Sequence, residues 1–338
     1  MTIQNEEVLR PPGLRRLVFA GEAIVDVVMR VPALPQRGGD ALATSAEILA
    51  GGGFNVMAAA ARQGLPVLYA GGHGRGPWGD VVRAALAAEG IGLLRDPDPD
   101  RDTGFDVALV EPDAERTFVT RLGAEAIHGP RAWAAVPAGP GDAVYVSGYG
   151  LVPPESGAAL GGWAASLPSG VLLFVDPGPL VAQIPAAVLD PVLARCDWLS
   201  CNHREAALLT STGPHKTGPS GASSADAPGD PAELARRLLA RGAAANVLVR
   251  AGAAGCYVAP LAASDAVHVR APAVTAVDTT GAGDAHSGAF LAALADGLAP
   301  LGAAARANAA AAFAVTRPGP ATSPTQAQLD AWLAAARD

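Results

Sequence analysis

The hydrophobic positions of the chain fall into two alternating kinds of segment. Short, fully apolar runs such as LVFAG at 17–21, VLLFVDP at 171–177 and NVLVRAG at 246–252 are typical of strands buried on both faces. Between such runs lie alanine- and leucine-rich segments with helical spacing, most of which stop at a glycine. This alternation predicts an α/β fold with a central, mostly parallel sheet covered by helices.

Two regions interrupt the alternation. Residues 101–121 predict a hairpin of two alternating strands around the sequence EPDAE. With residues from about 36 to 48, this hairpin is expected to form a small β-sheet inserted in the α/β core. A Gly/Pro/Ser-rich stretch at 211–231 is expected to be a flexible surface loop. We expect residues 1–338 to form a single domain with these two insertions.

Composition narrows the class of protein. Half of the residues are hydrophobic and the net charge is -8, which indicates a globular protein and disfavours nucleic acid or an anionic membrane as partner. The three cysteines form no CxxC pair, and the N-terminus lacks the order of a signal peptide. The alanine-rich tract at 301–315 is interrupted by Arg306 and Asn308, so we expect a buried helix there and not a membrane span. The expected location is the cytoplasm.

The sequence DTTGAGD at 278–284 joins a strand-like segment to an alanine-rich helix. Gly281 and Gly283 allow a tight turn that exposes consecutive N–H groups, and the helix adds its unpaired amides and the positive end of its dipole. Together these features predict a phosphate site, with Asp284 within reach of the bound group. The alternative is that Asp284 only caps the helix.

A second glycine-rich turn, GRGPWG at 74–79, has the spacing of a dinucleotide-binding fingerprint. Asp96 and Asp98 follow about twenty residues later, as that fingerprint requires. Pro77 and Trp78 fill the tight turn, however, and the preceding strand is not the first of a βαβ series. An oxidoreductase is therefore the weaker hypothesis.

Five stretches carry a further pattern in this order along the chain: AGGGFNVMAAAARQG at 50–64, DTGFDVALVEPDAERTF at 102–118, CNHREAALLT at 201–210, VLVRAGAAGCYV at 247–258 and DTTGAGDAHSGAFLAAL at 278–294. They resemble the signatures of the ribokinase family of carbohydrate kinases, over roughly residues 16–335. The resemblance implies a three-layer α/β core with a small β lid and ATP-dependent phosphorylation of a sugar hydroxymethyl group. Members of this family often pair through their lids, so a homodimer is expected.

The resemblance implies roles for the turn. Asp284 would be the general base that takes a proton from a sugar hydroxyl, whose oxygen then attacks the γ-phosphate of ATP. The amides of Gly281, Ala282, Gly283 and Asp284 would form the anion hole. In the family, the sugar is held by positions that match Asp26, Gly51, Gly52 and Asn55. Arg116, on the lid hairpin, is a further substrate candidate that would face an anionic or hydroxyl-rich group. The alternatives are structural turns for the glycines and a solvated hairpin residue for Arg116.

Further positions match the family's nucleotide and ion sites. Asn202 and Glu205 would order Mg²⁺ and its waters; alternatively they are a helix-capping asparagine and a surface glutamate. Arg250, Gly252 and Gly255 would lie along ATP, and Asn308 would lie near the adenine. A monovalent cation, usually K⁺, is implied beside the anion hole, with matching positions Asp278, Thr280, Ala314, Arg317, Gly319 and Ser323.

Several positions depart from typical ribokinases. His286 stands where an aromatic residue usually follows the base, as packing or as a polar neighbour of the site, and Tyr149 stands near the place of an acidic ribose contact. The segment Gly52-Gly53-Phe54 replaces the lysine-containing helix entry of typical ribokinases. Ribose, fructose, a sugar acid such as 2-keto-3-deoxygluconate and a nucleoside all remain open as substrates. A sensor that binds a sugar without catalysis is the alternative from another class.

Overall fold

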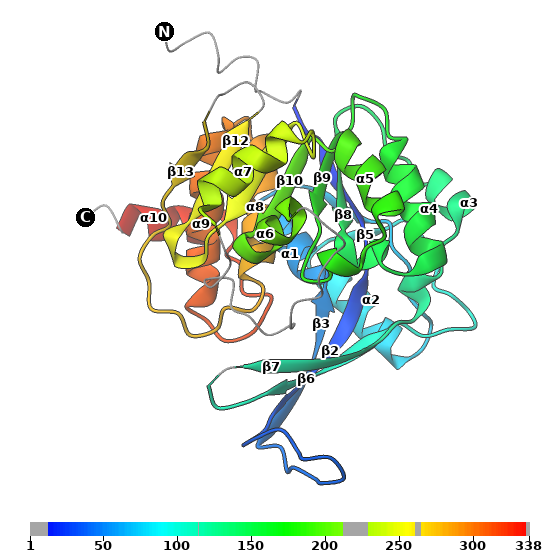
Figure 1. The fold of residues 1–338 in the computed structure, drawn as a ribbon. Helices are drawn as coiled ribbons and strands as arrows, with labels where there is room; N and C mark the ends of the chain where they lie inside the picture. The colour runs from blue at the N-terminus through cyan, green and yellow to red at the C-terminus, as the bar shows by residue number, and fades with distance from the viewer. Residues whose placement is uncertain (1–12, 114, 212–228, 261–264, 336–338) are drawn as a thin grey trace, which may run out of the picture.

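A nine-stranded sheet runs through the centre of the molecule (Figure 1). The computed structural model describes residues 13–113, 115–211, 229–260 and 265–335, so most of the predicted loop at 211–231 lies outside the described residues. The strand order is β13-β12-β11-β10-β9-β8-β1-β4-β5. The strands are β1 (Arg16–Ala20), β4 (Val67–Tyr69), β5 (Gly92–Leu93), β8 (Asp142–Ser147), β9 (Leu172–Asp176), β10 (Trp198–Asn202), β11 (Asn246–Arg250), β12 (Cys256–Pro260) and β13 (Val267–Val269). Neighbouring strands are parallel except at one edge, where β12 pairs antiparallel with β11 and β13.

Helices cover both faces of this sheet (Figure 1). Strand β1 shows the reason, because Leu17 and Phe19 pack into one apolar cluster and Val18 and Ala20 into the other. One face carries α1 (Phe54–Arg62), α2 (Pro77–Ala88), α8 (Ala282–Ala295), α9 (Pro300–Val315) and α10 (Gln326–Ala335). The other carries α3 (Pro130–Ala134), α4 (Pro154–Ala165), α5 (Ala186–Arg195), α6 (His203–Thr210) and α7 (Pro231–Ala240). Within the described ranges, no helix combines the length and apolar character needed to cross a membrane.

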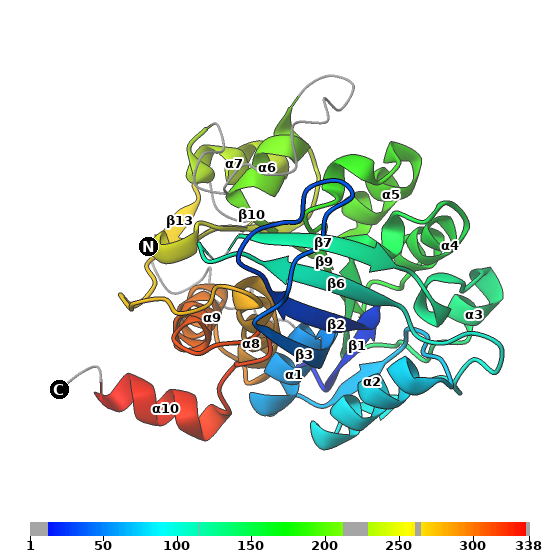
Figure 2. The ribbon, with the colours of Figure 1, turned by 90° about the horizontal axis from the view of Figure 1, so that it is seen from below.

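A separate four-stranded sheet lies below the core, as the view from below shows (Figure 2). Its order is β3-β2-β6-β7, from β2 (Ala23–Arg30), β3 (Ser45–Gly52), β6 (Phe105–Val110) and β7 (Arg116–Arg121). The strand expected at about 36–48 has other bounds in the structure. Residues 36–44 form no strand, and β3 continues to Gly52. The sequence did not predict that β2 belongs to this sheet, because the buried first half of β2 has the apolar character of a core strand.

The small sheet stands at the carboxyl ends of the parallel strands. Strand β2 follows β1 after two residues, so the chain leaves the core directly into the small sheet. Ser147, Asp176, Asn202 and Arg250 are the last residues of β8, β9, β10 and β11. In open α/β sheets, ligands bind outside the carboxyl ends of the strands. The space between these ends and the small sheet is therefore the place to look for a site.

Candidate active site

The turn at 278–284 ends at helix α8, and Gly281 is the residue that makes it possible. Gly281 is the N-cap of the helix with φ of 71°, in the left-handed region that favours glycine. A side chain here would overlap the carbonyl oxygen of Pro320. The local sequence thus folds as predicted from its glycines, with the backbone pressed against a neighbouring segment.

The amides of this turn are largely open. Among the described residues, the N–H groups of Gly281, Gly283 and Asp284 have no acceptor, whereas that of Ala282 donates to the Thr279 carbonyl oxygen at 3.3 Å. The N–H groups of the turn lie at the positive end of a helix of fourteen residues. Unpaired amides at such a point form an anion-binding site.

Asp284 lies in the first turn of α8 beside these amides. Its carboxylate accepts a hydrogen bond from the Nδ2 of Asn55 at 3.2 Å, so the structure brings two of the predicted site residues together across 229 positions of sequence. Burial, and then the negative charge of Asp176, raises the pKa of Asp284 to about 6. The Oδ1 of Asn55 is buried without a partner among the described residues.

Asp26 faces the same region from the small sheet. A side chain at Gly51 would overlap the Asp26 carboxyl group, so glycine at this position leaves room for the acid. Gly52 adopts a φ of 59°, which turns β3 toward α1 and Asn55. Burial raises the pKa of Asp26 to about 7, with added effects from Asp106 and Asp284.

Asp106 is an acid that sequence reasoning missed. It pairs in register with Asp26 on the adjacent strand β6, so both side chains project from one face of the small sheet. Asp106 is only 8% exposed, its Oδ1 has no partner among the described residues, and burial raises its pKa to about 6. The available signal was the alternation in FDVALV, which puts this aspartate in phase with the buried Ala108 and Val110.

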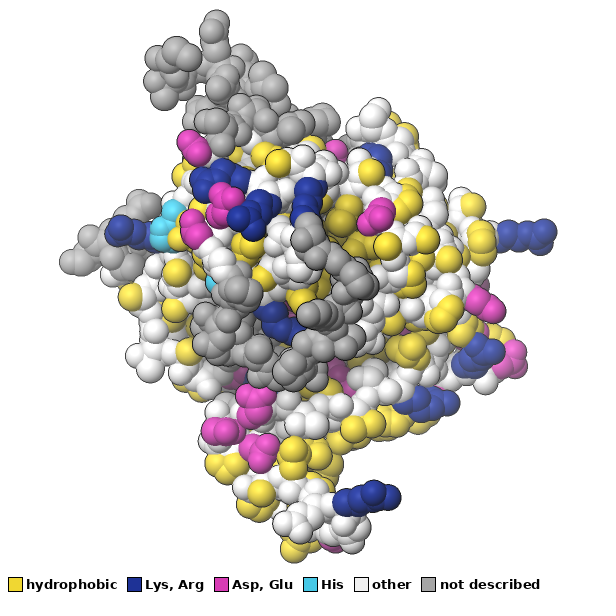
Figure 3. Space-filling view, viewed as in Figure 1, with side chains coloured by type: hydrophobic (Ala, Val, Ile, Leu, Met, Phe, Trp, Pro, Cys, Tyr) yellow, Lys and Arg dark blue, Asp and Glu magenta, His cyan; other side chains and the backbone are white. Residues whose placement is uncertain are grey.

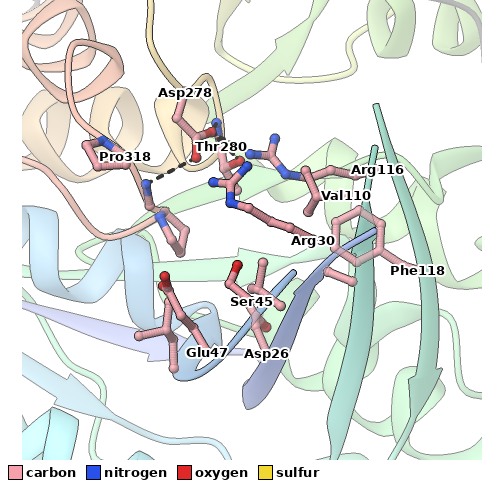
Figure 4. Close-up of a pocket in the computed structure, with 15 residues that line it drawn as sticks. Asp26, Arg30, Ser45, Glu47, Val110, Arg116, Phe118, Asp278, Thr280 and Pro318 are labelled. Atoms are coloured by element: carbon pink, nitrogen blue, oxygen red, sulfur yellow. Dashed lines mark hydrogen bonds and ion pairs between the residues drawn. The ribbon is translucent and has the colours of Figure 1, made fainter. Parts of the chain in front are cut away.

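A cavity of about 130 Å³ separates this face of the small sheet from the turn. Figure 4 shows Asp26, Ser45 and Glu47 on one side of it and Asp278 and Thr280 on the other, with Arg30 and Arg116 between. The residues that line it are Asp26, Val28, Arg30, Ser45, Glu47, Leu49, Ala108, Val110, Arg116, Phe118, Asp278, Thr280, Pro318, Gly319 and Pro320. The cavity therefore joins predicted substrate residues to residues predicted for a cation.

Asp278 holds the first part of the turn. Its Oδ1 accepts from the backbone N–H and hydroxyl of Thr280 at 2.9 and 2.7 Å and from Arg116 at 2.6 Å, and its Oδ2 accepts from the Gly319 N–H at 3.1 Å. Burial acts to raise the pKa of Asp278, but these donors outweigh it and lower the pKa to about 2. The carboxylate is ionised and already paired with a cation.

The other residues predicted for a cation lie at the end of α9 and just beyond it. The Ala314 carbonyl accepts from Thr322, and the Arg317 guanidinium lies over the ring of Phe313. The Oγ of Ser323 is buried and has no partner among the described residues. The Ser323 hydroxyl oxygen is thus available as an ion ligand, whereas the Asp278 carboxylate already has its hydrogen-bond partners.

Arg250 lies in a buried ionic network beneath the turn. It donates to Asp176 at 2.8 Å and to the hydroxyls of Ser200 and Ser287, and it approaches Glu205 at 3.7 Å. Burial lowers the pKa of Arg250, but the two carboxylates outweigh it and raise the pKa, so the residue stays charged. Its position supplies fixed positive charge close to Asp284.

Asn202 and Glu205 form a capping box at the start of α6. The Asn202 side chain accepts from the Glu205 N–H at 2.8 Å, while the Glu205 carboxylate accepts from the Asn202 N–H at 2.7 Å and from its Nδ2 at 2.8 Å. Glu205 is 2% exposed, so it is not the surface glutamate of the alternative reading. Among the described residues, no cluster of three or more His, Cys, Asp or Glu side chains is arranged to hold a metal ion.

The remaining predicted nucleotide residues lie at the antiparallel edge of the sheet. Gly252 and Gly255 bound the turn between β11 and β12 with φ values of 58° and 99°. Asn308 is buried in α9 and donates to the carbonyl oxygens of Val269 at 2.8 Å and Arg270 at 3.4 Å. The structure thus places these residues apart from the cavity, around one end of β11 and β13.

The glycine turn at 74–79 differs in the state of its amides. The Asp102 carboxylate accepts from the N–H groups of Trp78 at 3.0 Å and Gly79 at 2.8 Å, and Thr103 accepts from Gly74 at 2.8 Å. A pyrophosphate needs these donors free. The geometry therefore disfavours the dinucleotide hypothesis.

His286 follows Asp284 on α8 and points into the protein. It is 3% exposed and stacks on Phe290 with ring centroids 6.4 Å apart. Burial lowers the pKa of His286 to about 3, so its ring is neutral. Tyr149 is partly exposed and lies beside Gly178.

Comparison with known proteins places the chain among the carbohydrate kinases. The chain belongs to the pfkB family of carbohydrate kinases, which matches residues 14–327. It is 32% identical to the protein named Uncharacterized sugar kinase YegV of Escherichia coli (strain K12), over 93% of this chain and 92% of that protein. These findings confirm the family and the enzyme class that the sequence predicted.

Solved structures confirm the fold class. The crystal structure of ribokinase from Thermotoga maritima superposes with a TM-score of 0.75 at 21% identity, over 95% of this chain and 100% of that chain. The structure of Arabidopsis thaliana ribokinase complexed with ribose and ATP gives a TM-score of 0.71 at 22% identity, over 95% and 99% of the two chains. The large, mostly parallel sheet and the small separate sheet are shared features of this fold.

Proposed function

We propose that this kinase transfers the γ-phosphate of ATP to a hydroxymethyl group of a neutral, hydroxyl-rich sugar. The observation that carries the proposal is the position of Asp284, which Asn55 holds beside the open amides of the 278–284 turn. The likeness to a ribokinase whose structure contains ribose and ATP supports ATP as the donor.

In this proposal, Asp284 removes the proton from the sugar hydroxyl, and the oxygen attacks the γ-phosphate. A pKa of about 6 keeps the carboxylate ionised at neutral pH and makes it a stronger base than an exposed aspartate. The amides at Gly281, Gly283 and Asp284 stabilise the charge on the phosphoryl group in transfer, which is worth roughly 3–4 kcal/mol for a single good donor. Arg250 adds fixed positive charge beneath the turn.

Substrate recognition falls to the acidic face of the small sheet. Asp26 and Asp106 stand side by side and lack protein donors in the described structure, so sugar hydroxyls are the groups they suit. Because these acids and Asp284 share one region, an acidic sugar would be repelled there. This charge arrangement favours a neutral sugar or nucleoside over a sugar acid such as 2-keto-3-deoxygluconate.

Magnesium would bind with the phosphates of ATP and neutralise their charge. Glu205 and Asn202 are the residues proposed to order it. Both oxygens of Glu205 already accept hydrogen bonds within the capping box, and each keeps capacity for one more donor, which fits contact through water. Gly252, Gly255 and Asn308 are the proposed nucleotide contacts.

The small sheet is proposed to act as a lid. In the space-filling view it projects from the core and carries hydrophobic side chains along its length (Figure 3). Closure over the sugar would exclude water, so that phosphate is not lost to hydrolysis. Pairing of two chains through this sheet stays a prediction.

The test is ADP release from Mg-ATP over a panel of pentoses, hexoses, sugar acids and nucleosides. We expect turnover with one neutral class and a loss of roughly 10²–10⁴-fold in kcat for Asp284→Asn, with sugar affinity largely kept. Asp296→Asn, an exposed aspartate at the far end of α8, is the matched control. Unchanged turnover in Asp284→Asn would remove the base from the mechanism, and sugar binding without turnover in the wild type would favour the sensor.

A further inference from the structure

The residues beside the 278–284 turn do not fit the monovalent-cation site that the family resemblance implies. Among the positions expected to form that site, Asp278 has the negatively charged side chain. In this chain the carboxylate already receives four hydrogen bonds, from Thr280 twice, from Gly319 and from Arg116. A K⁺ ion placed beside Asp278 would meet the Arg116 guanidinium and be repelled by it.

Arg116 is well placed to act as the counter-charge. It is the first residue of β7, and its Nη2 lies 2.6 Å from the Asp278 Oδ1, with side-chain exposures of only 20% and 9%. Figure 4 shows the guanidinium directed from the small sheet to the carboxylate across the cavity. Partial burial keeps the pair poorly screened by solvent and salt.

We infer that Arg116 is a built-in cation that takes the place of a monovalent ion and fixes the 278–284 turn from the small sheet. It is a positioning residue, because it acts on the anion-binding amides through Asp278 and Thr280. The proposal deepens the proposed function by stating how this site is regulated: its geometry depends on the position of the small sheet and not on the supply of K⁺.

The same contact links the lid to the catalytic turn. Asp278 binds the Thr280 N–H two residues along, directly before the left-handed Gly281. When β7 approaches the core, Arg116 completes the set of donors around Asp278. When it withdraws, the carboxylate loses its cation while the backbone donors remain. The turn therefore has its full electrostatic support only with the small sheet in place.

Removing the guanidinium should expose a latent ion site. The Oγ of Ser323 is buried without a partner in the described part of the chain, and it lies on the segment that follows Gly319. With Arg116→Gln, Asp278 keeps its donors from Thr280 and Gly319 but loses its positively charged partner. A monovalent cation of suitable size then becomes the natural counter-charge.

The experiment measures the thermal unfolding midpoint without substrate, in buffers of equal ionic strength that contain KCl or choline chloride. We expect no K⁺-specific change for the wild type, and for Arg116→Gln a midpoint lowered by roughly 2–4 °C in choline and recovered in K⁺. Arg121→Gln, at the other end of the same strand, is the matched control and should behave as the wild type. Arg116→Lys keeps the charge and should stay insensitive to K⁺.

A K⁺-specific stabilisation of the wild type would overturn the inference, and so would a lack of K⁺ response in Arg116→Gln. Because this readout needs no turnover, it stands or falls separately from the proposed kinase activity. Once a substrate is known, a second readout follows: Arg116→Gln should lose about tenfold or more in kcat in choline and regain part of it in K⁺.

Discussion

The glycine-rich turns at 74–79 and 278–284 both precede helices, and they differ in whether the amides at the helix N-terminus are open. At 74–79 the Asp102 carboxylate occupies the N–H groups of Trp78 and Gly79. At 278–284 the acid at the start, Asp278, binds Thr280, Gly319 and Arg116, and leaves the amides at the helix N-terminus open. A glycine pattern is therefore no evidence of a phosphate site until the partners of its amides are known.

The position of one carboxylate decides between the two outcomes. Asp102 comes from a segment outside its turn and points at the first turn of α2, so it plays the part that a phosphate would play. Asp284 lies within the first turn of α8, and its carboxylate binds the Asn55 side chain instead of the helix amides. The first acid satisfies the amides of its helix, whereas the second leaves them open.

Among substitutions that change the backbone or the capping of the two turns, the largest effect is expected for Gly281→Ala. A methyl group here would overlap the Pro320 carbonyl and would hold alanine at a φ of 71°. The turn must shift, and we expect kcat to fall by about 10²-fold or more as the amides lose their alignment. Steady-state ADP release with the identified sugar measures this loss.

Gly297→Ala is the control for backbone strain in that comparison. Gly297 lies just beyond the other end of α8 with a φ of 82°, and a side chain there meets no atom within 4 Å. We expect it to cost about 1–2 kcal/mol of stability with kcat unchanged. Equal kcat for both variants would show that the 278–284 turn has no part in the chemistry.

The pH dependence of catalysis should show whether Asp284, in the 278–284 turn, acts as a base. As a base, Asp284 is active only when ionised, and burial raises its pKa to about 6. The value of kcat/KM, which reports ionisation in the free enzyme, should therefore level off above pH 7 and fall about fivefold between pH 6 and pH 5. A profile that is flat from pH 5 to 8 would contradict the role of Asp284 as base.

Opening the closed turn should affect stability alone. Asp102→Ala removes the acceptor of three backbone N–H groups, those of Trp78, Gly79 and Thr103, and we expect a loss of about 1–2 kcal/mol, as for other helix N-caps. Turnover of the folded enzyme should be unchanged. Chemical denaturation and steady-state rates, measured on the same preparation, separate the two effects, and a large loss of kcat would show that both turns serve catalysis.

The smallest effect is expected at Asp106, a buried acid whose Oδ1, unlike the carboxylate oxygens of Asp102, has no hydrogen-bond donor among the described residues. Its folded pKa of about 6 lies above the value of an exposed aspartate, so its ionisation destabilises the fold as pH rises through 6. Asp106→Asn should raise the free energy of unfolding by about 1 kcal/mol at pH 8 and by less at pH 5. A destabilised variant at pH 8 would contradict this account of the carboxyl group.

Local pattern was sufficient for most of the fold. The apolar run at 246–250 is β11, the hairpin strands lie at 105–110 and 116–121, and the alanine-rich tract is helix α9. Strand β2 was harder, because period and burial reveal a strand but not the sheet to which it belongs. That choice is made by pairing with β3 and β6, which are set by contacts distant in sequence.

The residues of the candidate site likewise divide into those that the sequence indicated and those that only the fold brings together. The 278–284 turn was visible in its glycines, and family resemblance pointed to Asn55 and Asp284, whose roles stay predictions. The Arg116–Asp278 pair joins residues 162 positions apart, and no spacing rule connects them. The pairing of Asp106 with Asp26 equally depends on register between strands, which only the folded chain defines.

The junction between the two sheets has a mechanical consequence. Strand β1 passes into β2 through two residues, and β3 passes into α1 through Gly53 alone. Asp26 on β2 and Asn55 at the start of α1 thus lie on opposite sides of these short connections, Asp26 on the small sheet and Asn55 on a helix packed in the core. Rotation of the small sheet about them would move the proposed sugar contact while the proposed partner of the base stays in place, so the small sheet would bring the sugar to a base that is already aimed.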